Sequence, residues 1–254
     1  MKSLTTFLLA VVLMAGTGYA YAQPYPAIKG DTTTELTDQH LSGFSRIKIA
    51  GPFDVHLIQG TEESVKIDVP ADVKGRITAK VSWGVLKIHQ THDNWGSGYQ
   101  SWYSEKSVWR NHKHIAVYIT AKDLNGITVS GSGHIKFDAG IAANSLTLKL
   151  RGSGEIMGKV DVKKLDSHVS GSGNIKLSGT AEHSAVRVSG SGNFSAPELL
   201  TAISAAKVSG SGRAKINASD RVNAAVSGSG GVSYTGAAKN INSSKSGSGQ
   251  INRF

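Results

Sequence analysis

Residues 127–137 read ITVSGSGHIKF, and this stretch decides the fold of the chain. Its apolar residues and both glycines occupy every second position, whereas threonine, serine, histidine and lysine occupy the positions between them. This alternation is typical of a β-strand with one buried face. Because the phase persists through Gly131-Ser132-Gly133, we predict that both glycines face inward and the serine faces outward.

The Gly-Ser-Gly triplet occurs seven times in the second half of the chain, at intervals of 21, 19, 19, 20, 18 and 19 residues. Flexible linkers lack such periodic apolar flanks, and a fixed period of about 20 residues indicates stacked units. We therefore predict an all-β fold, a right-handed parallel β-helix of about seven coils of 18–21 residues over 121–254. A meander of antiparallel hairpins is the alternative, but it would need turn signals about every 8–12 residues.

Glycine is expected where a coil turns a corner, because a β-carbon there would crowd the neighbouring backbone. The triplet glycines are predicted to occupy these corners: Gly131, Gly133, Gly152, Gly154, Gly171, Gly173, Gly190, Gly192, Gly210, Gly212, Gly228, Gly230, Gly247 and Gly249. The position two before the triplet is apolar from Val129 to Val226 and becomes Lys245 in the last coil. A coil without an apolar face is expected to cap the stack.

The composition fits a packed, exported protein. The 254 residues include 30 glycines, 5 prolines and no cysteine, which excludes collagen, disulfides and thiolate metal sites. Residues 1–22 have the positive start, apolar run and small-x-small end of a signal peptide. That run is well short of the roughly 20 residues that span a bilayer, so we expect no transmembrane segment in the mature chain.

We expect a flexible leader over 23–42 and a single domain over 43–254, whose part 43–120 is rich in strands but lacks the triplet. The net charge is +10. Export argues against nucleic acid as a partner, so the charge favours an acidic polysaccharide, lipid head groups or an acidic protein surface. Charge that serves solubility alone is the alternative. The sequence leaves the oligomeric state open.

Three stretches resemble the head GIN domain, a domain of unknown function described as the head of an auto-transporter adhesin. They are Phe44 to Gly60 with its Gly51-Pro52-Phe53-Asp54-Val55 core, Trp83-Gly84-Val85-Leu86-Lys87-Ile88, and Leu124 to Gly133, and the later Gly-Ser-Gly-Asn-Ile at 171–175 matches the repeating signature. The resemblance extends over about 44–254. It implies an exported β-helical protein in the periplasm or on the outer surface of a Gram-negative-type bacterium, and it carries over no catalytic residues.

The segment 89–112 reads HQTHDNWGSGYQSWYSEKSVWRNH and is the most distinctive part outside the repeats. Strands are expected on both sides of it, so we interpret it as a long hairpin excursion. Exposed aromatic rings on a loop commonly bind sugars or protein partners, although these rings could instead cap the end of the β-helix. The candidate ligand-binding residues are Trp95, Tyr99, Trp102, Tyr103 and Trp109.

Four histidines bracket this excursion: His89, His92, His112 and His114. Three imidazoles could bind Zn²⁺ or Cu²⁺, but the spacing matches no known signature. We therefore predict no metal site and no cofactor.

Position three before the triplet is rich in cations, since it holds Thr128, Lys149, His168, Arg187 and Lys207. Such a column would favour an anionic polymer, or would simply deter aggregation of exposed strands.

Catalysis is not expected, because no two carboxylates stack just after the triplet and the short intervals leave little chain for cleft walls. We predict a non-catalytic, adhesin-like module that binds a glycan or an envelope or surface protein. A structural module of the envelope is the alternative, and a polysaccharide-active enzyme is a weaker one.

Overall fold

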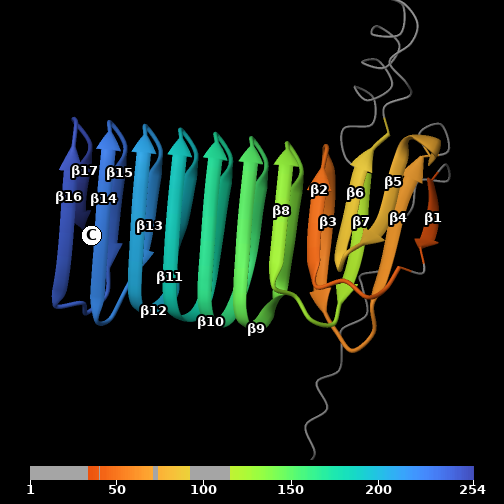
Figure 1. Ribbon diagram of the computed structural model, residues 1–254, viewed down its shortest axis with the longest axis horizontal. Helices are drawn as coiled ribbons and strands as arrows, with labels where there is room; N and C mark the ends of the chain where they lie inside the picture. Colours follow the sequence, from red (N-terminus) through yellow and green to blue (C-terminus); the bar gives the residue numbers. More distant parts are fainter. Residues whose placement is uncertain (1–33, 40, 71–73, 92–114) are drawn as a thin grey trace, which may run out of the picture.

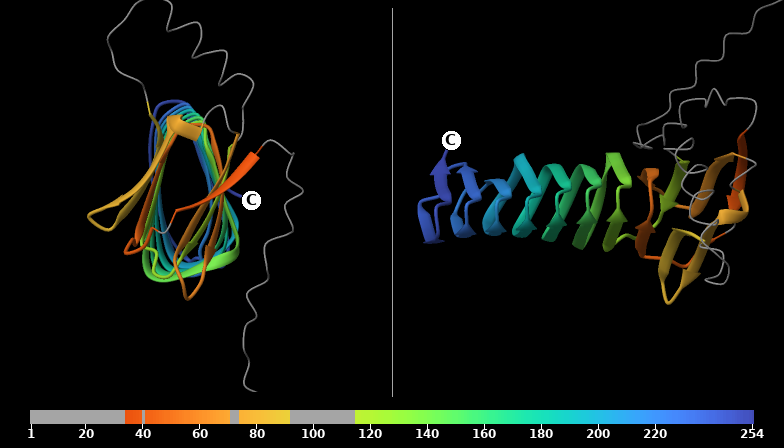
Figure 2. Two further views of the ribbon diagram at one scale, coloured as in Figure 1. Left: turned by 90° about the vertical axis from the view of Figure 1, so that its right-hand side faces the viewer. Right: turned by 90° about the horizontal axis from the view of Figure 1, so that it is seen from above.

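The computed structural model describes residues 34–39, 41–70, 74–91 and 115–254. These residues form an all-β chain whose strands stack side by side into a long column (Figure 1). Seen down the column, the coils superimpose as a narrow, flattened ring (Figure 2). The predicted all-β fold is confirmed: the chain is a parallel β-solenoid of about seven turns with a strand-rich N-terminal portion.

Each coil has two legs that meet at a Gly-Ser-Gly corner. The legs that run toward the corner form one sheet, here called the approach sheet. Its strands are β6 (Val85–Gln90), β2 (Arg46–Ala50), β8 (Gly126–Gly131), the second halves of β9 (His134–Gly152), β10 (Glu155–Gly171), β11 (Asn174–Gly190) and β12 (Asn193–Gly210), then β14 (Arg221–Gly228) and β16 (Asn240–Ser246).

The legs that leave the corner form the departure sheet. Its strands are β7 (Ile115–Ala121), β3 (Phe53–Gln59), the first halves of β9 to β12, β13 (Arg213–Asn217), β15 (Gly231–Thr235) and β17 (Gln250–Arg253). Equivalent residues of successive coils pair in parallel register, as Val169 does with Leu150 below and Val188 above. Side chains that share a position therefore form ladders along the column, with rungs about 4.8 Å apart.

The two glycines of each triplet have different structural roles. The first has a φ between +95° and +115°, a left-handed conformation that glycine alone adopts readily. It is exposed or half-buried, so the prediction that both glycines face inward is wrong for this position. The second is buried in every triplet. A β-carbon on Gly154 would lie 2.2 Å from the carbonyl oxygen of Gly133 in the coil below, so the close stacking of corners excludes any side chain there.

The N-terminal portion is part of the stack, although its coils do not follow the order of the sequence. The β2–β3 coil lies between the β6–β7 coil and the β8–β9 coil, because β2 pairs with both β6 and β8 while β3 pairs with both β7 and β9. The pairing of Asp54 with His134 places Gly51-Pro52-Phe53 at the position of Gly131-Ser132-Gly133. The Phe53 ring is fully buried there and takes the place of the second glycine.

Antiparallel strands complete this end of the column. β4 (Ser64–Pro70) pairs with β7, and β5 (Ile77–Ser82) pairs with β6 after the short 3₁₀ helix η1 (Lys74–Arg76). β1 (Thr34–Gln39) pairs with β4. The predicted leader over 23–42 is therefore wrong for 34–39, since an antiparallel edge strand is held by backbone hydrogen bonds and needs no apolar periodicity.

The core thins toward the C-terminus, as the sequence predicts. Its largest fully buried side chains include Phe53, Phe137 and Phe194, whereas the last coils contribute mostly alanine and valine. Every residue of β16 is exposed and all but Ile241 are polar, so the last coil ends the stack with a mostly polar strand.

Candidate binding surface

A row of cations runs across the approach sheet at a single register position. Cross-strand pairing connects Lys80 to Lys87, Lys87 to Lys48, Lys48 to Thr128, and then onward through the repeat coils to Lys207. We call the following residues the basic row: Lys80, Lys87, Lys48, Lys149, His168, Arg187 and Lys207. The sequence pattern shows only the part from Thr128 onward, because Lys48, Lys87 and Lys80 join the row through pairing between distant strands.

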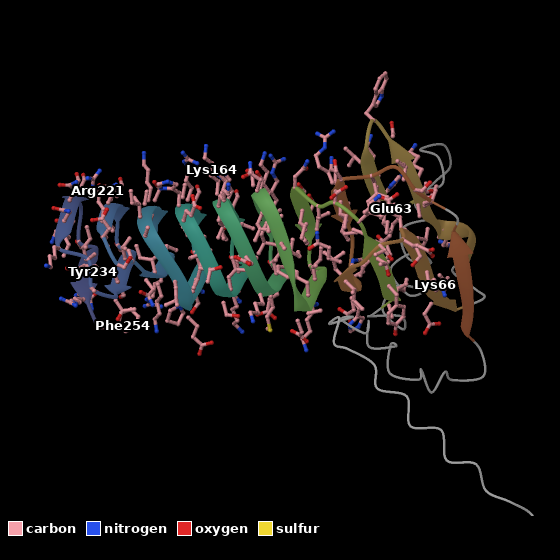
Figure 3. The ribbon with its side chains drawn as sticks, turned by 90° about the horizontal axis from the view of Figure 1, so that it is seen from below. Glu63, Lys66, Lys164, Arg221, Tyr234 and Phe254 are labelled. Atoms are coloured by element: carbon pink, nitrogen blue, oxygen red, sulfur yellow. The ribbon has the colours of Figure 1, made fainter. Side chains whose placement is uncertain are left out.

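Further cations flank the basic row on the same outward side of the approach sheet. They are Arg46, Arg151, Lys164 and Arg221, and together with the basic row they form what we call the basic face. Figure 3 shows Lys164 and Arg221 on one edge of the column. Among the outward positions of the described approach strands, Asp166 is the one carboxylate. The basic face therefore has a strong excess of positive charge.

The electrostatics of His168 reflect this excess. Its pKa is lowered first by partial burial, then by the charges of Arg187 and Lys149, while Asp166 opposes the shift. The guanidinium Nη1 of Arg187 lies 3.4 Å from the imidazole Nε2 of His168. Like charges in adjacent rungs thus disfavour a further proton within the row.

The departure sheet carries cations as well, and carboxylates lie against two of its lysines. Lys136 Nζ lies 2.7 Å from Asp138 Oδ2, and Lys176 Nζ lies 2.9 Å from Glu155 Oε1. His134 Nδ1 lies 3.1 Å from Asp54 Oδ1. Within the part of the chain that the structure describes, no comparable ion pair reaches the basic row. The two sheets therefore differ in net charge although the same coils build them.

A shallow depression of about 400 Å³ lies on the C-terminal half of the basic face. Its floor is made of small side chains, among them Ala205 and Ala225, and its rim includes Arg187 and Lys207. The amide of Asn242 donates a hydrogen bond of 3.0 Å to the side-chain oxygen of Asn223 at the other rim. An apolar floor with cationic and amide groups around it suits a ligand that has both a carbon skeleton and negative charge.

The predicted binding residues of the 89–112 segment, Trp95, Tyr99, Trp102, Tyr103 and Trp109, lie outside the described residues. The ends of the segment are described, and they do not form a hairpin. β6 continues to Gln90 in the approach sheet and β7 begins at Ile115 in the departure sheet. The expectation of a hairpin excursion is therefore wrong, because the strands on either side of the segment belong to different sheets, and its described ends lie beside the β2–β3 coil.

Of the four histidines considered for metal binding, His89 lies in β6 and the others lie outside the described residues. The described ranges hold no cluster of three or more histidine, cysteine or acidic side chains that could bind a metal ion. Nor do they contain a helix of the length and apolarity that crossing a membrane requires.

Sequence reasoning missed one conspicuous residue, Trp83. The sequence indicates a turn at Trp83-Gly84, and the structure confirms a two-residue turn between β5 and β6. The Trp83 side chain is 92% exposed, and its φ is 55°, the only positive φ among the described residues other than glycine. Asparagine or aspartate is usual at that position of such a turn. A tryptophan before Gly84 is therefore the sequence signal that could have marked Trp83 as unusual.

Comparisons with known proteins agree with this architecture. The model of a family described as "Putative auto-transporter adhesin, head GIN domain" matches residues 43–238. Among proteins with curated functions, none matches this sequence.

Solved structures show the same fold. A "putative adhesin" from Bacteroides fragilis superimposes with a TM-score of 0.77 at 23% identity, over 88% of this chain and 98% of the other. A "Putative lipid binding protein" from Parabacteroides distasonis gives 0.69 at 21% identity, over 89% and 98%. A "putative adhesin" from the same species gives 0.68 at 19% identity, over 89% and 98%. At these identities the superpositions show a shared fold. They do not show what this chain binds.

Proposed function

Because this chain belongs to the head GIN domain family, we propose that it is an exported, non-enzymatic binding module of the cell envelope that holds acidic polysaccharides on its basic face. The observation that carries the proposal is the basic row, in which lysine or arginine occupies six of the eight rungs from Lys80 to Lys207, with Thr128 and His168 at the other two. The signal-peptide pattern of residues 1–22 supports export to the periplasm or to the outer surface.

The geometry of the row favours an extended polymer over a small anion. Neighbouring rungs are about 4.8 Å apart, which is less than the screening length of about 8 Å in physiological salt. Each cation therefore repels its neighbours when no ligand is present. A polymer with regularly spaced negative charges relieves this repulsion along the whole row, whereas a single small anion relieves it at one point.

A non-enzymatic role fits the shape of this surface. The depression on the basic face is open and shallow, and it is lined by alanine, asparagine and cations rather than by paired carboxylates. Glycosidic cleavage commonly needs an acid and a base or nucleophile on opposite sides of the bond. The basic face offers an array of positive charges that can hold a polysaccharide. Among its described residues there is no pair of carboxylates.

The 89–112 segment is a second proposed contact. In support of this contact, the described residues on either side of it, Gln90 and Ile115, lie where the approach and departure sheets meet, in the same coil as Lys87 of the basic row. Replacement of Trp95, Trp102 and Trp109 by serine is expected to weaken retention of a ligand without unfolding the chain. Unfolding of this variant would instead assign the rings to the closure of the core.

Retention on immobilised polysaccharides tests the proposal. We expect the chain to be retained on polygalacturonate and released by sodium chloride, because counterions compete for the cations. It should pass unretained through neutral dextran, and incubation with polygalacturonate should release no new reducing ends. Absence of retention at low salt, or the appearance of reducing ends, would contradict the proposal.

A further inference from the structure

Trp83 is a large apolar side chain that contributes nothing visible to the core. It stands at the tip of the β5–β6 hairpin, where Ser82 pairs with Val85 and only Trp83 and Gly84 form the turn. Both turn residues have positive φ, 55° and 68°, as a type I′ turn requires. A side chain in this conformation costs about 1–2 kcal/mol. A residue that costs conformational energy while 92% of its surface is exposed indicates a role outside the fold.

The hairpin tip is held rigidly against the neighbouring coil. Nη2 of Arg46 donates a hydrogen bond of 2.9 Å to the carbonyl oxygen of Trp83. The backbone amides of Ser45 and Arg46 both donate to the carbonyl oxygen of Gly84, at 3.1 and 3.2 Å. The backbone that carries the indole is therefore fixed before any ligand arrives, which reduces the entropic cost of binding.

The tip also lies at the end of the basic face. Lys80 and Lys87, the first two cations of the basic row, belong to the same hairpin, and Arg46 belongs to the basic face. Figure 2 shows this yellow-to-gold hairpin flaring away from the column, and in Figure 3 it rises on the side where Lys164 and Arg221 lie. A polymer that follows the basic row toward the N-terminal coils therefore reaches the exposed indole.

We propose that Trp83 is an aromatic platform on which a sugar ring of the bound acidic polysaccharide stacks, at the N-terminal end of the basic row. This inference rests on the proposed function and narrows it to polymers built of pyranose rings that carry carboxylates. The indole packs against the apolar C–H face of a ring, while Lys80, Lys87 and Arg46 hold the negative charges of the same segment. A polyanion without rings would use the cations and leave the indole unused.

A linear glycan fits these observations better than a lipid surface. Tryptophan and lysine together also occur in proteins that lie on membranes. Here, however, the cations follow one line along the column, and the other large exposed hydrophobic side chains among the described residues, Leu200, Ile241 and Phe254, lie on distant coils. One indole beside a line of positive charges fits a single linear polysaccharide. It does not fit the extended apolar surface of a lipid bilayer.

The test uses the full chain and compares three probes. These are polygalacturonate, inorganic polyphosphate, and vesicles of phosphatidylcholine with phosphatidylglycerol. The key variant is Trp83→Asn, because asparagine favours the left-handed turn and should preserve or raise the melting temperature. Trp83→Phe keeps a smaller ring as the matched control. We expect Trp83→Asn to weaken polygalacturonate binding about tenfold, Trp83→Phe to weaken it less, and polyphosphate binding to remain unchanged.

Each other outcome overturns the inference. Unchanged polygalacturonate binding by Trp83→Asn would show that no sugar stacks on the indole. Equal losses for polygalacturonate and polyphosphate, or a lower melting temperature, would assign Trp83 to electrostatics or to the fold. A loss confined to the vesicles would identify a lipid contact. If the unmodified chain binds polyphosphate but not polygalacturonate, the stacking inference fails while polyanion binding stands. If it binds neither, the proposed function itself fails.

Discussion

The approach sheet and the departure sheet share every coil and every corner of this solenoid, yet their outer surfaces differ in charge. On the departure sheet, Lys136 and Lys176 lie against carboxylates. On the approach sheet, cations follow one another across the rungs, and Arg187 lies against His168 rather than against an acid. The inward positions of both sheets are constrained by packing, so the difference arises at positions that the fold leaves free. A like-charged row lowers stability, and the proposed binding of a polyanion would relieve this repulsion.

The shared corner is the feature whose loss should affect both sheets most strongly. Gly154→Ala would place a β-carbon 2.2 Å from the carbonyl oxygen of Gly133, and backbone can move away only by separating the coils. We expect the free energy of unfolding in urea to fall by about 3 kcal/mol. Ser153→Ala, one residue away and exposed, is the matched control and should change little. A Gly154→Ala variant as stable as the parent would refute the close stacking of the corners.

The inner surfaces of the two sheets differ as well, and one buried hydroxyl tests this. Ser167, Ser184 and Ser204 all lie on the inner side of the approach sheet, and their hydroxyls find no hydrogen-bond partner among the described residues. Ser204→Ala removes such a group and should raise the free energy of unfolding by about 1 kcal/mol. Ser189→Ala, on the outer side of the same sheet, should be neutral. A loss of stability for Ser204→Ala would reveal a buried water that binds the hydroxyl.

Removing the acids of the departure sheet should make it resemble the approach sheet. The triple variant Asp54→Asn, Asp138→Asn and Glu155→Gln leaves Lys136 and Lys176 without their carboxylate partners. We expect affinity for polygalacturonate to rise about threefold, because each uncompensated surface cation contributes well under 1 kcal/mol. Titration calorimetry at low salt measures this change. An unchanged or lower affinity would show that charge alone does not distinguish the two sheets.

The smallest expected effect concerns the proton on His168. Its pKa in the folded chain is lowered, chiefly by partial burial and then by Arg187 and Lys149. The unfolded chain therefore takes up this proton first as the pH falls below about 6.5, and stability decreases over that range. His168→Gln should lose less stability between pH 7 and pH 5 than the parent chain. Equal losses in thermal melts would contradict the assignment.

A bound polyanion should reverse this shift, because it favours the charged imidazole. We expect the pKa of His168, followed by NMR, to rise when polygalacturonate is added. A pKa that stays in place while the polymer binds would locate the polymer away from the basic row.

The repeat half of this fold could be predicted from sequence because its information is local. The alternation around Gly131-Ser132-Gly133 identifies the strands and the corners, and Lys245 identifies the capping coil. The N-terminal order could not be predicted in the same way. Gly51-Pro52-Phe53 occupies a corner without the triplet, and the β2–β3 coil finds its neighbours through pairing between strands distant in sequence.

The candidate surface was predictable in part for the same reason. The column from Lys149 to Lys207 repeats at the interval of the triplets, so it is visible in the sequence. Lys48, Lys87 and Lys80 extend it only once the register of β2, β6 and β5 is known. The exposure of Trp83 depends on how far its hairpin projects from the column. The alternation of apolar and polar residues does not indicate that direction.

The most direct test of the basic face compares matched neutralisations on the two sheets. One variant carries Lys149→Gln, Arg187→Gln and Lys207→Gln on the approach sheet, and the other carries Lys136→Gln, Lys159→Gln and Lys176→Gln on the departure sheet. Both lose the same formal charge. We predict that the first lowers affinity for polygalacturonate about tenfold, at roughly 0.5 kcal/mol for each cation, and that the second changes it little. Equal losses from the two variants would contradict the claim that the basic face is the binding surface.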